Sequence, residues 1–243
     1  MNAAISRADI LVTAMARELT DGGVVATGVA SPLAILAIAV AKATHAPGLH
    51  YISCVGSLNP ALPCLYSSPE DLRYLQGRTA EVSIPELFDH ARRGRIDTVF
   101  FGAAEVDLRG QTNMSAAGSL SQPTAKFPGV AGAATLRRWV KNPVLLIPKQ
   151  SRRALVNEVQ VATTRDPKRP VRVMTDLGIF LLHQQEASLL SLHPGVELAE
   201  LTQRTGFSFT VSSDLQKTPE PSPEIMAAIS KIDRDNLRYQ LVG

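Results

Sequence analysis

The chain has 243 residues, of which 45% are hydrophobic and 19% charged, and its net charge is +3. This composition supplies enough apolar material for the core of one large domain or two small ones. Basic residues are scattered and aromatic residues make up only 5%, which argues against a nucleic-acid-binding surface, whereas a small positive excess suits an anionic small ligand.

The two cysteines, Cys54 and Cys64, are too few for a disulfide framework or a paired zinc site, and the histidines share no metal-ligand spacing. We therefore expect no bound metal. The first ten residues lack the basic start and apolar core of a signal peptide. The longest apolar run, 32–40, is too short to cross a bilayer. These features predict a reduced, soluble, cytoplasmic protein.

The first fifty residues alternate between helix and strand signals. Ser6 can cap a helix over 7–20, and a first strand follows at 24–28. Ser31 and Pro32 begin a second helix over 32–44, which is apolar nearly all round and therefore predicted to be buried. A strand at 50–54 comes next. The order strand, helix, strand predicts a right-handed crossover and a parallel pair.

The remainder of the chain continues this pattern after an irregular, proline-containing segment at 57–80. We predict helices over 85–94, 196–205 and 223–234, and strands over 98–102, 143–148, 155–160, 171–175, 178–182 and 207–211. The fold class is α/β, with an open, largely parallel sheet flanked by helices. We expect an α/β domain over 1–213, followed by an extended arm and helix over 214–243.

Cys54 is the first candidate functional residue. It ends an apolar strand and is followed by Val55 and Gly56. In open α/β sheets, ligands bind in the crevice at the carboxyl ends of the strands, which places Cys54 where chemistry can occur. The alternative is a buried packing role, because free cysteine is among the most buried residue types.

Three glycine-rich turns follow predicted strands, at 26–30, 102–110 and 128–134. Small residues allow a ligand to approach the backbone, so that amide N–H groups can bind an anionic oxygen. Ordinary turn chemistry is the alternative. The candidate substrate-binding residues are Gly28, Gly56, Gly102, Ala103, Gly129 and Gly132.

Several spaced motifs together resemble the β subunit of family I CoA-transferases of the glutaconate CoA-transferase type. They are ATG at 26–28, the strand ending in Cys54-Val-Gly56, GAAEVDLRGQTNMS at 102–115, KFPGVAGAA at 126–134, VMTDLG at 173–178, LHPGV at 192–196 and TGF at 205–207. The resemblance spans residues 7–212. It implies the family's α/β fold and a homologous α subunit as partner, in a heterodimer or heterotetramer whose active site lies between the two chains.

The resemblance also identifies a departure at the catalytic position. In this family a glutamate attacks the acyl-CoA thioester, and the matching residue here is Cys54. A thiol cannot enter the carboxylate–anhydride cycle that moves CoA between acids, and no acidic residue lies between His45 and Pro69 to replace the glutamate. Ordinary CoA transfer is therefore not expected.

A cysteine at this position is similar to the pattern of 3-methylglutaconyl-CoA decarboxylases built on the transferase scaffold. That resemblance implies conversion of 3-methylglutaconyl-CoA to 3,3-dimethylacrylyl-CoA, towards isovaleryl-CoA, with catalytic Cys54 and no cofactor beyond the CoA of the substrate. The chain would be one subunit of a lyase, with no nucleic-acid or membrane partner. Two alternatives remain: a carbon–carbon hydrolase that opens a ring in a CoA thioester, and a non-catalytic partner subunit.

Other polar residues have structural interpretations beside the functional ones. Glu105 and Asp107 can orient their loop or move protons, and Asn113 can bind a thioester oxygen or cap a turn. His193 is expected to make a structural hydrogen bond, and Cys64 to pack in its loop. The remaining candidates, which could meet CoA phosphates but more simply form a solvated helix face, are Arg137, Arg138 and Lys141.

Overall fold

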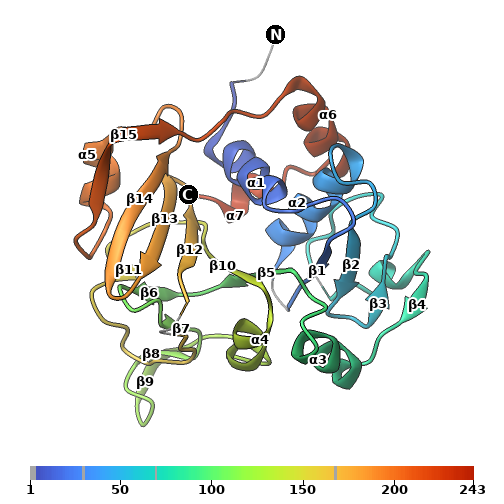
Figure 1. Ribbon diagram of the computed structural model, residues 1–243, viewed down its shortest axis with the longest axis horizontal. Helices are drawn as coiled ribbons and strands as arrows, with labels where there is room; N and C mark the ends of the chain where they lie inside the picture. Colours follow the sequence, from blue (N-terminus) through green and yellow to red (C-terminus); the bar gives the residue numbers. More distant parts are fainter. Residues whose placement is uncertain (1–3, 29–30, 69, 167–168) are drawn as a thin grey trace. The chain divides into compact units, whose positions relative to one another are not determined.

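The computed structural model describes residues 4–28, 31–68, 70–166 and 169–243 (Figure 1). Internal contacts divide the chain into two units. The first comprises Met1–Phe100, Trp139–Asn142 and Pro219–Gly243, and the second comprises Phe101–Arg138 and Pro143–Thr218. Most of the segment expected as an arm and helix, Pro219–Gly243, therefore belongs to the first unit.

The sheet of the first unit has the strand order β5-β1-β2-β3-β4. Its central strand β1 (Val24–Ala26) runs parallel to β2 (His50–Ser53) and to β5 (Thr98–Gly102). This confirms the predicted parallel pair. The irregular segment adds two short antiparallel strands, β3 (Ser57–Leu58) and β4 (Ala80–Glu81), and the 3-10 helix η1 (Leu72–Leu75).

Helices α1 (Arg7–Arg17) and α2 (Pro32–Ala43) pack against each other in the first unit. The side chain of Ser6 accepts from the Asp9 amide, and the Asp9 carboxylate accepts from the Ser6 amide, so α1 begins with a capping box. Every residue from Leu33 to Ala41 is buried, as the all-apolar sequence of α2 predicts. Helix α3 (Ile84–Arg92) begins with a second capping box, at Ser83.

The C-terminal helices α6 (Pro223–Ile232) and α7 (Arg238–Leu241) pack against α1 in the same unit. The buried guanidinium of Arg238 lies 2.7 Å from Asp9 Oδ1 and 2.8 Å from Asp233 Oδ2. These two ion pairs join the C-terminal segment to the first helix of the chain.

The main sheet of the second unit is mixed. Strand β10 (Asn142–Ile147) is parallel to β12 (Val171–Thr175), which is antiparallel to β13 (Gly178–His183). Strand β14 (Glu186–Leu192) is antiparallel to β13, and β15 (Thr210–Lys217) is parallel to β14; the helix α5 (Leu198–Gln203) connects these last two. We did not predict β14, because its hairpin turn uses Gln184 and Gln185 with positive φ in place of an Asn-Gly signal.

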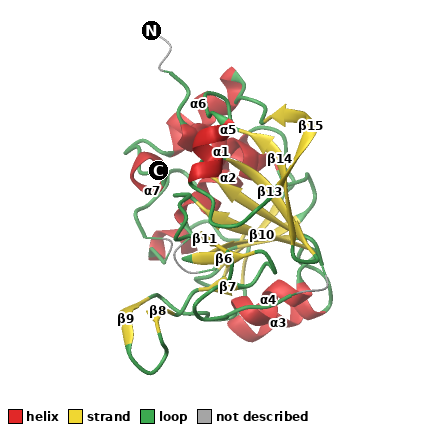
Figure 2. Ribbon diagram, turned by 90° about the vertical axis from the view of Figure 1, so that its left-hand side faces the viewer, coloured by secondary structure: helices red, strands yellow, loops and turns green. Residues whose placement is uncertain are grey.

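Smaller strands complete the second unit. A three-stranded sheet joins β6 (Glu105–Asp107), β7 (Thr112–Asn113) and β11 (Leu155–Val156). Figure 2 shows the hairpin of β8 (Ala116–Gly118) and β9 (Pro123–Lys126) extending away from β6 and β7. Helix α4 (Ala133–Trp139) follows the hairpin in sequence. Within the described ranges, no helix has the length and apolar composition that crossing a membrane requires.

Candidate active site

Cys54 lies in the tight turn that follows β2, in a half-buried position. The Gly56 amide donates to the Ser53 carbonyl (3.1 Å), and the Val55 amide donates to Ser53 Oγ (3.2 Å), so hydrogen bonds close the turn on both sides of the cysteine. The neighbouring strand β1 extends its pairing one residue further, because the Thr27 amide donates to the Ile52 carbonyl (3.2 Å). The parallel pair thus places Thr27 and Cys54 at the same sheet edge, as expected.

A buried hydroxyl network supports the thiol. Thr27 Oγ1 and the Tyr51 hydroxyl are 2.9 Å apart, and both residues are almost fully buried. Thr27 also forms a side-chain hydrogen bond with the Cys54 thiol. Burial raises the pKa of the Cys54 thiol and the nearby negative charge of Glu70 raises it further, while the Thr27 hydrogen bond lowers it. The net pKa is raised, so the thiol holds its proton at neutral pH.

Glu70 is the acidic residue that sequence reasoning missed. The stretch around Cys54 that contains no acidic residue ends at Pro69, one residue before Glu70. Glu70 accepts a hydrogen bond from Ser68 Oγ (2.9 Å), and its charge acts on the Cys54 thiol. The two residues are separated in sequence by strand β3 and an irregular loop, so only the folded loop reveals their interaction.

Gly28 lies in the turn after β1 and Gly56 in the turn after β2, and the two turns differ in how strictly they require glycine. Gly56 has φ +89°, and an added Cβ would lie 3.2 Å from the Val82 carbonyl oxygen. Gly28 is exposed, and an added Cβ there meets nothing within 4 Å. Val29 and Ala30 of the same predicted turn lie outside the described residues.

The other candidate small residues belong to the second unit or to the end of β5. Gly102 ends β5, Ala103 follows it, and Gly129 and Gly132 precede α4. The Ala104 amide donates to the Asn113 carbonyl and the Gly129 amide to the Met114 carbonyl, so these two turns meet at adjacent residues. The amides of Ala103 and Gly129 already donate within the chain, at 3.4 and 2.9 Å, so small size is what these two residues offer a ligand.

The loop containing Glu105, Asp107 and Asn113 is held by its own side chains. Asp107 is fully buried and accepts from the amides of Arg109, Gln111 and Val159 and from the Gln111 side chain. Asn113 Nδ2 donates to Glu105 Oε2 (2.9 Å) and to the Ala116 carbonyl (2.8 Å). Asp107 and Asn113 therefore hold the conformation of their loop. This is the structural one of the two interpretations that the sequence left open.

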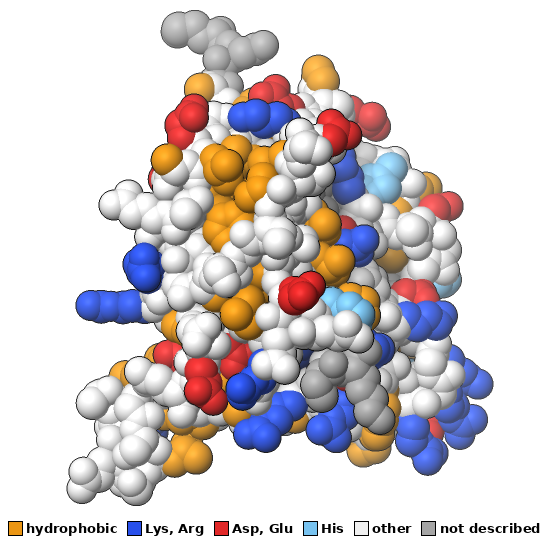
Figure 3. All heavy atoms as spheres, turned by 60° about the vertical axis from the view of Figure 1, so that its left-hand side comes forward, with side chains coloured by type: hydrophobic (Ala, Val, Ile, Leu, Met, Phe, Trp, Pro, Cys, Tyr) orange, Lys and Arg blue, Asp and Glu red, His pale blue; other side chains and the backbone are white. Residues whose placement is uncertain are grey.

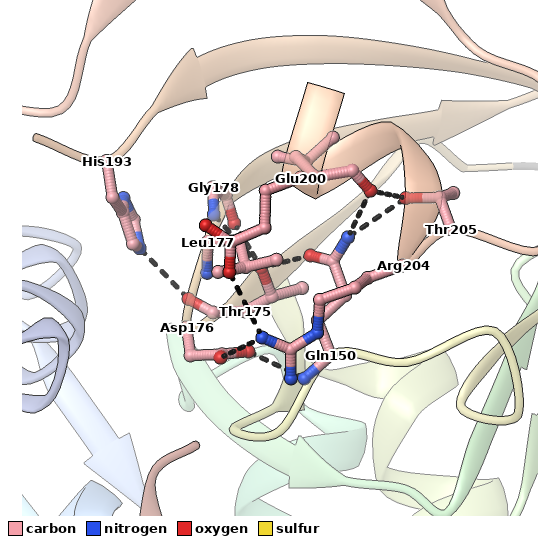
Figure 4. A network of polar contacts seen from close by, with 10 residues as sticks. Gln150, Thr175, Asp176, Leu177, Gly178, His193, Glu200, Arg204 and Thr205 are labelled. Atoms are coloured by element: carbon pink, nitrogen blue, oxygen red, sulfur yellow. Dashed lines mark hydrogen bonds and ion pairs between the residues drawn. The ribbon is translucent and has the colours of Figure 1, made fainter. Parts of the chain in front are cut away.

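His193 also has a structural role, at the edge of the network drawn in Figure 4. Its Nε2 donates to the Thr175 carbonyl (2.9 Å), and its Nδ1 lies 2.8 Å from Thr218 Oγ1. The bond from His193 to Thr175 links the LHPGV and VMTDLG motifs. The Thr175 hydroxyl in turn donates to Gln150 Oε1 (2.7 Å), which lies outside both motifs.

The prediction of a solvated helix face at Arg137, Arg138 and Lys141 is correct only for Arg138, because Arg137 is buried and Lys141 lies beyond the end of α4. Arg137 is 1% exposed and donates from Nη1 to Thr164 Oγ1 (2.9 Å). Burial lowers its pKa to about 10. Arg138 is exposed, and Lys141 lies 2.7 Å from Asp97. Of these two neighbouring arginines, Arg137 points into the protein and Arg138 points to solvent, a difference that the charge pattern of the sequence does not reveal.

The chain is similar to known proteins over most of its length. The chain matches the family described as Coenzyme A transferase over residues 9–203. The crystal structure of the decarboxylase AibA/AibB superposes with a TM-score of 0.96 and 63% identity, covering 98% of this chain and 99% of that chain. Variants of that decarboxylase in which one cysteine is replaced by valine, alanine, asparagine or serine match equally, each at a TM-score of 0.96.

Two other relatives have different activities in their names. A 3-oxoadipate CoA-transferase subunit of Pseudomonas knackmussii is 28% identical over 252 residues, covering 95% of this chain and 94% of that protein. The cholesterol ring-cleaving hydrolase IpdB subunit of Rhodococcus jostii is 30% identical over 174 residues, covering 65% of this chain and 68% of that protein.

Proposed function

Because the chain belongs to the Coenzyme A transferase family, we propose that it is the β subunit of a CoA-transferase-like decarboxylase that acts on a glutaconyl-type acyl-CoA. The observation that carries this proposal is the half-buried thiol of Cys54 in the turn after β2. Burial and Glu70 raise the pKa of Cys54, so this position offers a proton donor. The 63% identity to one chain of a decarboxylase supports the same reaction class.

The chemistry needs no electron acceptor or organic cofactor beyond the CoA of the substrate. In a glutaconyl-type thioester, the distal carboxylate leaves as CO₂ and its bonding electron pair passes into the conjugated system. The charge of the resulting dienolate spreads onto the thioester oxygen, where hydrogen-bond donors stabilise it. The Cys54 thiol then gives its proton to the terminal carbon, and the thiolate regains a proton from water. The CoA thioester stays intact.

The substrate that we propose is 3-methylglutaconyl-CoA, which yields 3,3-dimethylacrylyl-CoA, a precursor of isovaleryl-CoA after reduction. The enzyme would accordingly be a carbon–carbon lyase of the cytoplasm. Its partner would be a homologous α subunit, in a heterodimer or heterotetramer. The AibA/AibB decarboxylase, whose name includes two components, supports this assembly.

A carbon–carbon hydrolase is the second candidate, because the IpdB relative is a ring-cleaving hydrolase. A non-catalytic subunit of a CoA-transferase is the third. Products separate the three. Decarboxylation releases CO₂ and keeps the thioester, ring hydrolysis consumes water without releasing CO₂, and transfer requires an acceptor acid.

The test uses the two-subunit complex and 3-methylglutaconyl-CoA labelled with ¹⁴C in its distal carboxylate. We expect one labelled CO₂ for each 3,3-dimethylacrylyl-CoA formed, without free CoA, and no turnover by either subunit alone. Thioester product without labelled CO₂, or free CoA in proportion to substrate consumed, would reject decarboxylation.

A further inference from the structure

A cavity of about 540 Å³ lies in the second unit, between the β8–β9 hairpin and the segment after β10. Its walls include Ala117 and Phe127 from the hairpin side, and Arg152, Arg153 and Val156 from the other side. On the face drawn in Figure 3, acidic and basic side chains lie next to one another at the base of the projection at the lower left. Glu105 also lines this space, and we call it the Glu105 cavity.

One oxygen of the Glu105 carboxylate is hydrogen-bonded within the described residues, and the other is not. Oε2 accepts from Asn113 Nδ2 (2.9 Å) and from the Gln160 amide (3.0 Å). Oε1 accepts no hydrogen bond within the part of the chain that the structure describes, although the residue is only 9% exposed. A carboxylate oxygen at a cavity wall accepts a hydrogen bond from a ligand N–H group.

Two guanidinium groups are available on the same cavity. Arg152 and Arg153 are exposed, and neither guanidinium forms a hydrogen bond or ion pair with another described residue. The other acid of the cavity, Glu158, lies 3.5 Å from Arg109, which offsets its charge. The planar fork of arginine matches the oxygens of a phosphate group.

The other walls combine small apolar side chains and the aromatic ring of Phe127 with the polar side chains of Ser151 and Gln160. Such walls suit a flat heterocycle, which aromatic side chains bind by stacking. We propose that the Glu105 cavity binds a phosphorylated adenosine, with the 6-amino group donating to Glu105 Oε1 and phosphates on Arg152 and Arg153. The source is either a free adenine nucleotide or the adenosine end of CoA, and the second source rests on the proposed function.

Isothermal titration calorimetry of the two-subunit complex tests this directly, without substrate turnover. The probes are adenosine 3′,5′-bisphosphate and its inosine counterpart, which carries an acceptor oxygen in place of the amino group. We expect the adenosine compound to bind about 10-fold more tightly, because the inosine oxygen faces a carboxylate. Arg152→Ala/Arg153→Ala should weaken both by about 10- to 100-fold, whereas Arg138→Ala should change neither.

Glu105→Gln is the most specific test of the contact with the base, because two donors already point at Oε2. Glutamine must place its carbonyl oxygen there and its NH₂ group in the position of Oε1, so the cavity wall becomes a donor. The variant should therefore prefer the inosine compound. Absence of binding to the wild type, or equal weakening of both compounds by Glu105→Gln, would overturn the proposal.

Competition with CoA distinguishes the two possible sources of the bound adenosine. If CoA displaces the bisphosphate, and the double arginine variant raises KM for the acyl-CoA but not for the acyl-pantetheine thioester, the ligand is the substrate's own adenosine. If CoA does not compete, the ligand is a free nucleotide. The calorimetric result stands whether or not the complex releases CO₂, so this inference and the proposed function fail separately.

Discussion

Cys54 differs from a reactive thiolate in its electrostatic surroundings. Burial and the negative charge of Glu70 both raise its pKa, and the hydrogen bond with Thr27 only partly offsets them. A thiol nucleophile needs the opposite environment, with cations or a helix N-terminus that lowers the pKa. The residue therefore suits proton donation better than nucleophilic attack.

Cys54→Ser keeps the size of the side chain but raises its pKa far above neutral. We expect kcat of the two-subunit complex to fall by about 10²–10⁴-fold, the usual range for an acid–base group, while acyl-CoA binding is retained. Cys64→Ser is the matched control and should leave kcat nearly unchanged, because Cys64 instead contacts Tyr66 in the loop before η1. A serine variant with normal turnover would assign the proton transfer to another group.

Thr27→Val removes the hydroxyl that lowers the Cys54 pKa. The active form in this account is the neutral thiol, so activity is lost as the pH rises through the thiol pKa. The substitution raises that pKa further, and the alkaline limb of the pH–kcat profile should move to higher pH. Thr13→Val, which removes a buried hydroxyl that donates to the Asp9 carbonyl in α1, should leave the limb in place. A shift to lower pH is the contrary result.

At the scale of single elements, the conformation of the turn after β2 depends on Gly56. Gly56→Ala places a Cβ at φ +89° and 3.2 Å from the Val82 carbonyl. This should destabilise the complex by about 1–2 kcal/mol and displace Cys54, which lowers kcat. Gly28→Ala should preserve stability, because its Cβ meets nothing within 4 Å. Urea denaturation of the two variants checks the difference, and equal midpoints would show that the turn tolerates a side chain.

The contact between α7 and α1 depends on Arg238. Arg238→Ala leaves the buried carboxylates of Asp9 and Asp233 without their cation, and should destabilise the protein by about 3–5 kcal/mol. Arg234→Ala, which removes an exposed guanidinium at the end of α6, should cost little. The measurement is again urea denaturation. A loss below about 1 kcal/mol for Arg238→Ala, typical of an exposed ion pair, would show that water replaces the guanidinium.

The elements that local sequence predicted are those with strong periodicity or caps. Examples are α1 with Ser6, α2 with its continuous apolar run, and the strand that became β5 with unchanged bounds. Strand β14 and the β8–β9 hairpin were missed because their turns carry no Asn-Gly or Asp-Gly signal. In the site, the position of Cys54 followed from sequence, whereas Thr27 and Glu70 depend on strand register and on the fold of a loop.

At the scale of the whole molecule, one side chain, Cys54, distinguishes the chain from a CoA-transferase scaffold. The family model matches residues 9–203, and the 63% identity to a decarboxylase extends over 98% of the chain. A carboxylate can form the mixed anhydride that passes CoA to another acid, and a thiol cannot. The central claim is that the Cys54 enzyme has lost CoA transfer and retained the stabilisation of a dienolate.

The most direct measurement of this claim incubates the wild-type complex and the Cys54→Glu complex with 3-methylglutaconyl-CoA and ¹⁴C-acetate. We expect no labelled acetyl-CoA from the wild type, which releases CO₂ instead, and trace label from Cys54→Glu, which regains the transferase carboxylate. Appreciable labelled acetyl-CoA from the wild-type complex would contradict the account.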